Sequence, residues 1–142
     1  MVLGAMEQIP QELDWVTVRA ECTIRSVFKC VRREIEVDVA MRNKYLSESQ
    51  KSNGVGFSVE DKDEDSFVVF RKFQGLAGTV SFAILGSCIK AINTIGNVTI
   101  EATIGMSDSG RCMLRVNESK RILEIETWQF RKKTLESLFF WC

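Results

Sequence analysis

The 142-residue sequence has no histidine, a single proline and no long apolar run. Histidine is the usual general base near neutral pH and the commonest metal ligand, so its absence removes Ser-His and Cys-His nucleophile pairs. The sequence also lacks glycine-rich phosphate-binding motifs and paired-cysteine zinc motifs. We therefore predict a protein that acts by binding and not by catalysis, without a metal or cofactor.

Net charge is also absent, because 19 basic and 19 acidic residues balance each other. Bulk charge therefore gives no support to a protein that coats nucleic acid or membranes non-specifically. No window approaches the roughly 20 apolar residues of a membrane span, and the first residues lack the basic and apolar regions of a signal peptide. We expect an intracellular protein, cytoplasmic or nuclear, that does not contact a membrane.

Paired cysteines are missing too, since the five cysteines are scattered as Cys22, Cys30, Cys88, Cys112 and Cys142. An odd number at irregular spacing argues against a disulfide framework and against a zinc knuckle. We expect most of these side chains to be buried as small apolar groups.

The sequence contains no segment with the composition of a flexible linker. With one proline and no Gly/Ser-rich tract, nothing divides the chain into separate parts. Its length is enough for one buried core and too short for two ordinary domains. We predict a single domain over residues 1–142, whose weakest join is the polar stretch 47–54 that ends in the turn-forming pair Asn53-Gly54.

Among the features that are present, apolar and polar residues alternate over residues 16–24 and again over 35–41. Alternation with a period of two is typical of a half-buried strand, and β-branched residues dominate the first stretch. We predict a strand to about residue 23, a short helix over 24–33 and a second strand over 35–41. One helix over 15–33 is the alternative, since the same apolar residues also share a helical face.

The clearest helix is predicted over residues 79–94, where apolar residues recur at helical spacing and Gly96 follows as a C-terminal cap. A short C-terminal helix is predicted over residues 131–141. Further strands are predicted over residues 56–60, 66–72, 98–104, 112–116 and 122–128. These elements predict an α+β fold in which antiparallel sheet packs against two or three helices, and a duplicated β-α-β-β-β arrangement is one way to build it.

Four basic residues of the predicted helix 24–33 share one face: Arg25, Lys29, Arg32 and Arg33. They lie opposite apolar residues and can contact the phosphates of DNA, which would make binding depend on salt. No aromatic residue belongs to this basic face, since Phe28 is placed on the apolar side, so base stacking is not indicated. The alternative is the solvent-facing side of an amphipathic helix.

An acidic run spans residues 60–65, with Asp61, Asp63 and Asp65 at the alternate spacing that calcium loops use. The glycine and the final glutamate of an EF-hand loop are missing, so a solvated loop between strands is the simpler interpretation. Two alternatives remain open. The run can mimic phosphates in a small inhibitor or immunity-type protein that neutralises a basic partner, or it can serve an enzyme together with Cys112.

A family resemblance covers about residues 76–130. The segments Lys90–Asn97 and Met113–Arg121 resemble parts of one unit of a sliding clamp, most of all the checkpoint clamp subunits related to PCNA. The resemblance implies β-α-β-β-β units and a ring around DNA that is lined by basic helices, which would turn the four basic residues toward DNA. The chain departs from this pattern, because the predicted central helix has Lys90 as its single charge and the length allows one domain at most.

The tail from Lys132 to Phe139 resembles a degenerate clamp-binding peptide, in which a glutamine, an aliphatic residue and two aromatics stand at fixed spacing. Lys132 replaces the glutamine and Leu138 replaces the first aromatic. Leu135, Leu138 and Phe139 would form one turn that fills an apolar pocket of a partner. The alternative is that they pack on the domain's own sheet.

Aromatic residues gather near the end of the chain: Trp128, Phe130, Phe139, Phe140 and Trp141. Such residues are enriched at interfaces but are also ordinary core residues. The leading prediction is a scaffold or binding module that acts as a subunit or adaptor of a larger complex, clamp-like in DNA replication or repair. It implies a protein partner, DNA contacted through the basic face, and an oligomer or hetero-complex as the working form.

Overall fold

Helices stand near both ends of the chain and strands fill its middle. The computed structural model describes residues 14–140. Its helices are α2 (Trp15–Glu21), α3 (Ile24–Lys44), α4 (Glu48–Ser52) and α5 (Thr127–Phe140). Its strands are β1 (Gly56–Asp63), β2 (Ser66–Lys72), β3 (Leu76–Leu85), β4 (Cys88–Asn93), β5 (Val98–Met106), β6 (Cys112–Glu118) and β7 (Arg121–Ile125). The predicted α+β class is confirmed.

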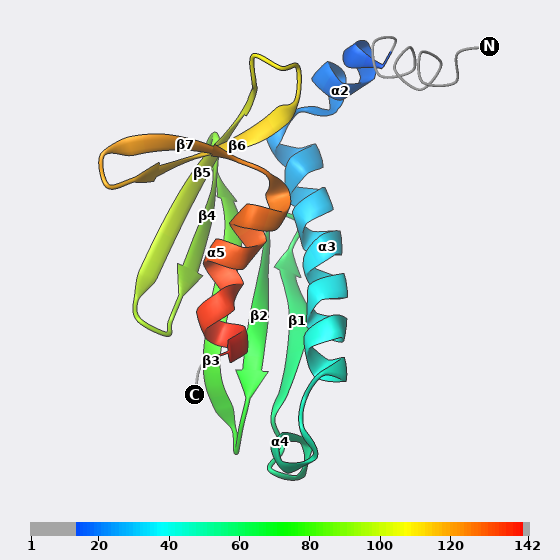
Figure 1. Ribbon diagram of the computed structural model, residues 1–142, viewed down its shortest axis with the longest axis vertical. Coiled ribbons are helices and arrows are strands. Elements are labelled where there is room, and N and C mark those ends of the chain that lie inside the picture. The colour runs from blue at the N-terminus through cyan, green and yellow to red at the C-terminus, as the bar shows by residue number, and fades with distance from the viewer. Residues whose placement is uncertain (1–13, 141–142) are drawn as a thin grey trace, which may run out of the picture.

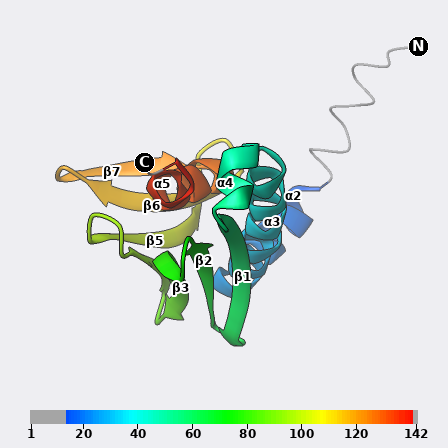
Figure 2. The same cartoon turned by 90° about the horizontal axis from the view of Figure 1, so that it is seen from below.

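The seven strands form one antiparallel sheet in the order β1 to β7, so each strand pairs with its neighbour in the chain. The sheet is curved, and α3 and α5 lie on the same side of it (Figures 1 and 2). Both helices begin near the same end of the sheet and run in the same direction (Figure 1). Within residues 14–140 no helix lies between the strands, so a simple meander takes the place of the duplicated β-α-β-β-β arrangement.

Four phenylalanines join the two helices to the centre of the sheet. The ring centroid of Phe67 on β2 lies 5.2 Å from that of Phe28 on α3 and 4.8 Å from that of Phe82 on β3. Phe82 in turn lies 6.2 Å from Phe130 on α5. Each of these rings is at most 4% exposed, and burying a side chain of this size contributes about 1.5–3 kcal/mol. The core therefore lies between the two helices and the inner face of the sheet.

The predicted helix over residues 79–94 is wrong, because this stretch is the hairpin of β3 and β4. Its apolar residues fit the helical period of 3.6 residues as well as the strand period of two. In the structure Val80 and Phe82 are buried and alternate with half-buried neighbours, as in a strand. The two-residue turn Gly86-Ser87 decides between the two structures. Gly86 has a positive φ of 61°, which a glycine adopts without strain and which suits a tight hairpin.

The second alternating stretch, residues 35–41, is helical and not extended. It lies within α3, where Ile35 and Val39 are buried while Val37 and Met41 are exposed. The inner and outer residues are thus each separated by four positions, as on a helix. The predicted strand over 35–41 is therefore wrong, and its apolar residues divide between the core and the surface.

A break at Thr23 separates α2 from α3. The Thr23 hydroxyl accepts a hydrogen bond from the backbone N–H of Ser26 at 3.2 Å and so caps α3. Neither the predicted strand to residue 23 nor one continuous helix over 15–33 is formed. The short α2 buries none of its residues.

Two asparagines fix the long helices to the sheet. Asn43 on α3 exchanges two hydrogen bonds with the backbone of Phe57 on β1, at 2.8 and 2.9 Å. Asn93 on β4 is 3% exposed and donates to the Thr134 carbonyl at 3.0 Å and to the Ser137 hydroxyl at 2.8 Å, both on α5. Because buried polar groups need partners, these bonds fix where α3 and α5 can lie.

One disulfide joins the start of α3 to the sheet. Cys22, between α2 and α3, is bonded to Cys112 at the start of β6, with their Cα atoms 5.5 Å apart. The prediction against disulfides is wrong for this pair, because the two residues are 90 positions apart and only the folded sheet brings them together. Cys30 and Cys88 are free thiols of intermediate burial, and Cys142 lies outside the described residues.

Candidate functional site

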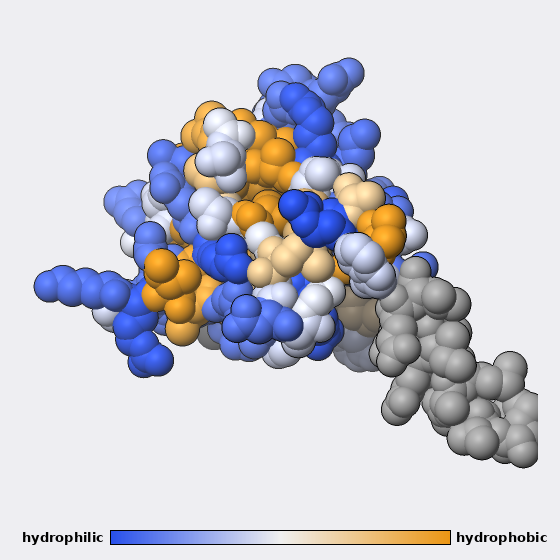
Figure 3. Space-filling model, turned by 90° about the horizontal axis from the view of Figure 1, so that it is seen from above, coloured by the Kyte–Doolittle hydropathy of each residue, from blue (hydrophilic) through white to orange (hydrophobic). Residues whose placement is uncertain are grey.

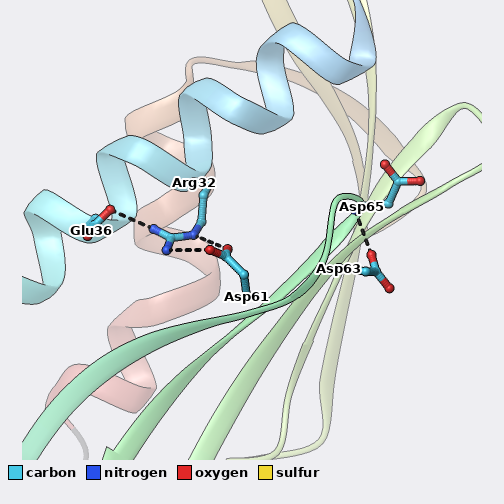
Figure 4. A network of polar contacts seen from close by, with 5 residues as sticks. All are labelled: Arg32, Glu36, Asp61, Asp63 and Asp65. Carbon is cyan, nitrogen blue, oxygen red and sulfur yellow. Dashed lines mark hydrogen bonds and ion pairs between the residues drawn. The ribbon is translucent and has the colours of Figure 1, made fainter.

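The basic residues predicted to face DNA divide into two pairs. Arg25 and Arg32 reach the hairpin between β1 and β2 and bind its acidic run. The guanidinium of Arg25 lies 2.6 Å from Asp65, and that of Arg32 lies 2.8 Å from Asp61. Figure 4 shows Arg32 between Asp61 and Glu36, and its distance from the Glu36 carboxylate is 3.0 Å.

These contacts shift the protonation equilibria of both partners. The hydrogen bond from Arg32 lowers the pKa of Asp61 below its usual value. The hydrogen bond to Asp61 in turn raises the pKa of Arg32. At these positions the basic face and the acidic run therefore compensate part of each other's charge, through a pair whose exposure keeps it weak.

The aspartates of the acidic run contact different groups. Asp61 turns toward Arg32, while Asp63 accepts a hydrogen bond from the backbone N–H of Asp65 at 2.8 Å (Figure 4). Within residues 14–140 no group of three or more acidic or cysteine side chains is placed to hold a metal ion. In the same residues no helix is long and apolar enough to cross a membrane.

Lys29 and Arg33, on the same helix, bind neither carboxylate of the hairpin. They line a hollow of about 500 Å³ between α2, α3 and β6, beside Cys30 and the disulfide-bonded Cys112. Burial raises the pKa of the Cys30 thiol, and the carboxylate of Glu34 acts in the same direction, so Cys30 stays a neutral thiol. The four predicted DNA-binding residues therefore share α3 but differ in their partners, since Arg25 and Arg32 bind carboxylates of the β1–β2 hairpin and Lys29 and Arg33 do not.

The three residues of the predicted partner-binding turn belong to the core. Leu135, Leu138 and Phe139 are 2%, 0% and 8% exposed and pack with the sheet residues of the core cluster. They lie in α5, which spans Thr127–Phe140 and not the predicted 131–141, whose last residue is outside the described part. The interpretation as a plug for a partner's pocket is wrong for this fold, because the chain's own sheet covers these side chains.

A groove between α3 and α5 is the best candidate for a binding site. Its volume is about 520 Å³. The lining residues are Asp38, Met41 and Arg42 of α3, Tyr45 at the end of α3, and Trp128, Arg131, Lys132, Leu135, Glu136, Phe139 and Phe140 of α5. Leu135 and Phe139, which were predicted to enter a partner's pocket, thus form part of the α5 side of this groove.

Large apolar side chains stand exposed along the groove. Tyr45 is 70% exposed, Phe140 63%, Trp128 51% and Met41 49%. Val37, one turn before Met41 on α3, does not line the groove itself but is 62% exposed and continues the same stripe beyond its edge. Monomeric domains seldom gather this much apolar surface in one place unless another molecule covers it. The residues just named, Val37, Met41, Tyr45, Trp128 and Phe140, are called the groove face below.

Ion pairs hold the two walls of the groove together. Arg131 on α5 lies 2.9 Å from Glu34 and 2.7 Å from Asp38, both on α3. The Arg131 side chain is only 15% exposed, against 62% for Arg25 in the other network. Because solvent screens it less, this bridge contributes more to the position of α3 than the exposed pair does.

Arg42 supports the aromatic end of the groove. Its guanidinium lies 4.6 Å from the ring centroid of Phe140 and 5.3 Å from that of Phe57. Its Nε donates to the carbonyl oxygen of Phe139 at 2.7 Å, where the last turn of α5 leaves carbonyls unpaired and favours a cation. Burial, with a smaller effect from the charge of Arg71, lowers the pKa of Arg42, but a guanidinium remains charged at neutral pH.

The sequence revealed this groove only in part. Trp128 and Phe140 were among the aromatic residues considered for an interface, whereas Tyr45 was missed. Val37 and Met41 were predicted as strand residues. The spacing of Val37, Met41 and Tyr45 at every fourth position was the available signal, because on a helix it forms one stripe.

Apolar residues are also exposed away from the groove. Leu85, Ile92 and Ile122 lie on strands and are 52%, 43% and 69% exposed. Figure 3 shows the end of the molecule nearest α2, where hydrophobic residues gather in a central area that hydrophilic residues border. Leu85, Ile92 and Ile122 do not line the α3–α5 groove, so they provide controls for its role.

Comparison with known proteins gave no match among family models, curated proteins or solved structures. The resemblance of residues 76–130 to a sliding clamp therefore stays a prediction.

Proposed function

We propose that this protein is a non-enzymatic interaction module, a subunit or adaptor of a larger assembly, that binds a partner protein through the α3–α5 groove. The observation that carries the proposal is the exposure of Met41, Tyr45, Trp128 and Phe140 around one hollow. Covering such side chains releases water and contributes roughly 25 cal/mol for each Å² of apolar surface that becomes buried. Aromatic residues in a partly preformed hollow are also the usual centres of binding energy at protein interfaces.

The form of the groove favours an elongated apolar element of the partner. α3 and α5 run side by side in the same direction (Figure 1), and two such helices accept the apolar stripe of a third helix between them. Arg131 holds the walls through Glu34 and Asp38. A groove that is fixed before binding loses little conformational entropy when a partner enters.

Photo-crosslinking in cells that express the protein tests this proposal. A photoreactive phenylalanine analogue replaces Met41 in the groove and, in a control, Ile122 on β7, which is exposed and lies outside it. We expect a specific adduct with a protein from position 41 and none from position 122. The change Trp128→Ser should reduce the adduct at position 41 about tenfold or more, since hot-spot residues act together.

Two outcomes of this experiment contradict the proposal. One is an equal yield of adducts from positions 41 and 122, which would indicate random collision. The other is an adduct at position 41 that Trp128→Ser leaves unchanged, because α5 would then play no part in the interface.

A clamp-like role on DNA is the second candidate function. Lys29 and Arg33 favour it, because both are exposed and neither belongs to a salt bridge within residues 14–140. Changing both to Ala should weaken DNA binding and reduce the slope of its salt dependence by roughly two phosphate contacts. Changing Arg25 and Arg32 to Ala should have a smaller effect, since carboxylates already hold them. Wild-type protein that binds no DNA at low salt would remove this candidate.

A further inference from the structure

We infer that the partner in the α3–α5 groove is a second copy of this chain, paired through the same face about a two-fold axis. The inference rests on the proposed function, because it requires the groove to be an interface. Three features of the groove face support a second copy: its area, its balance of charge and the placement of its aromatic residues.

The exposed apolar area is large enough for a dimer. The five side chains of the groove face are between 49% and 70% exposed. With about 150–250 Å² for a whole aromatic side chain, Tyr45, Trp128 and Phe140 together present roughly 300–450 Å² per copy. Two copies would therefore bury roughly 600–900 Å² on these three residues, and Val37, Met41 and the polar rim add to a total near the lower end of specific protein interfaces, about 1,200 Å².

Charge around the groove is balanced, and its charged residues are Glu34, Asp38, Glu136, Arg42, Arg131 and Lys132. Most of them already pair within the chain, Arg131 with Glu34 and Asp38, and Lys132 with Glu136 at 3.2 Å. A strongly acidic or basic partner would therefore gain no steering from this face. A surface that is apolar in its centre and neutral as a whole matches it, and a second copy presents such a surface.

The aromatic residues are placed as a two-fold axis requires. Trp128 lies in the first turn of α5, whereas Phe140 ends α5 and Tyr45 ends α3. α5 has 14 residues, so these groups stand about 20 Å apart along the helices. A two-fold axis perpendicular to the helices reverses the second copy, and Trp128 of each copy then meets Tyr45 and Phe140 of the other. The helix dipoles are antiparallel in this arrangement, which is favourable.

Sedimentation equilibrium on the purified full chain tests the inference. Non-reducing gels first exclude covalent dimers through the free thiols of Cys30 and Cys88. We expect a reversible monomer–dimer equilibrium whose dissociation constant rises at least about tenfold in Met41→Glu, because a charge would be buried at the centre of the interface. Ile122→Glu, the matched control, should change it by less than about twofold. Circular dichroism verifies that both variants are folded.

A mixed-isotope crosslink tests the two-fold geometry. Light protein with a photoreactive group at position 45 is mixed with uniformly ¹⁵N-labelled wild type. We expect light-to-heavy crosslinked peptides that contain the start of α5 around Trp128. Crosslinks to β7 or to the outer face of the sheet would overturn the proposed axis.

The outcomes separate this inference from the proposed function. A monomer at every concentration, together with the adduct at position 41 in cells, overturns the second copy and leaves the proposed function standing. A monomer without that adduct overturns both. A dimer that Ile122→Glu disrupts and Met41→Glu leaves intact overturns the second copy in the groove, because its interface lies elsewhere, and the adduct at position 41 then decides the proposed function.

Discussion

The two halves of α3 expose different kinds of side chain. Residues 24–33 expose basic side chains, whereas residues 34–44 also expose large apolar ones. The first half carries the predicted basic face, yet two of its three arginines, Arg25 and Arg32, are held by carboxylates of the β1–β2 hairpin. The second half exposes Val37 and Met41, and two of its acidic residues turn toward Arg131 on α5.

The difference between the halves shows that charge in a sequence is not the same as available charge in a fold. A paired charge gives a partner little net attraction. An apolar side chain that its own fold leaves uncovered favours association, because water is released when it is covered. The second half of α3 is therefore the stronger candidate for an interface, although it carries no binding motif.

Removing the disulfide should give the largest effect, because this bond ties the start of α3 to β6 across 90 residues of sequence. Cys22→Ser should lower the free energy of unfolding by about 2–5 kcal/mol. Urea denaturation compares it with Cys30→Ser, which removes a free thiol. Equal midpoints for the two variants would mean that the first half of α3 does not depend on this anchor.

Changing Arg131 should loosen the second half of α3. Arg131→Ala leaves the carboxylates of Glu34 and Asp38 without their cation and should cost about 1–3 kcal/mol. Lys132→Ala removes an exposed pair with Glu136 and should cost less than about 0.5 kcal/mol. Chemical denaturation measures both, and a loss for Lys132→Ala as large as that for Arg131→Ala would contradict the assignment of Arg131 as the bridge.

Breaking the pair between Arg32 and Asp61 should cost less than breaking the bridge at Arg131. Asp61 is 65% exposed, so the coupling between the two side chains should be about 0.2–1 kcal/mol. A double-mutant cycle with Arg32→Ala and Asp61→Ala measures it, and a second cycle on Arg131 and Asp38 gives the reference. A larger coupling energy for Arg32 and Asp61 than for Arg131 and Asp38 would contradict this order of strengths.

Lowering the pH should reduce the stability of the protein only slightly, through the pair of Arg32 in the first half of α3 with Asp61. Arg32 lowers the pKa of Asp61 in the folded protein, whereas an unfolded aspartate titrates near about 3.9. The pair therefore contributes stability above about pH 4, and this contribution is lost as the pH falls through the lower folded pKa. The difference in stability between wild type and Asp61→Asn, measured between about pH 2 and pH 6, should shrink toward acid. A difference that grows toward acid would contradict the pairing.

The strands after the central hairpin could be predicted from the sequence, because the turns that separate them are polar and their apolar residues fit a single period. Residues 79–94 could not, since their apolar positions fit a helix and a strand equally well. Gly86 was the one local sign of the hairpin, and its positive φ of 61° follows from its place in the turn. Residues 35–41 of α3 were ambiguous for the same reason, because their alternating apolar residues also fit a helix with Ile35 and Val39 on its buried side.

The candidate site was harder to predict, because its parts are joined by contacts that are distant in sequence. Arg25 and Arg32 meet their carboxylates 40 and 29 residues away, so the sequence could show the charges but not their pairing. The groove depends on α3 and α5 lying side by side, and Arg131 meets Asp38 across 93 residues. Local periodicity carries no information on contacts of this length.

One measurement compares the two halves of α3 directly. The photoreactive residue is placed at Lys29 in the first half and at Val37 in the second half, both of which are exposed on the same helix. We predict protein adducts from position 37 that Trp128→Ser removes, and none from position 29. Adducts from position 29 alone would contradict the assignment of the α3–α5 groove as the interaction surface.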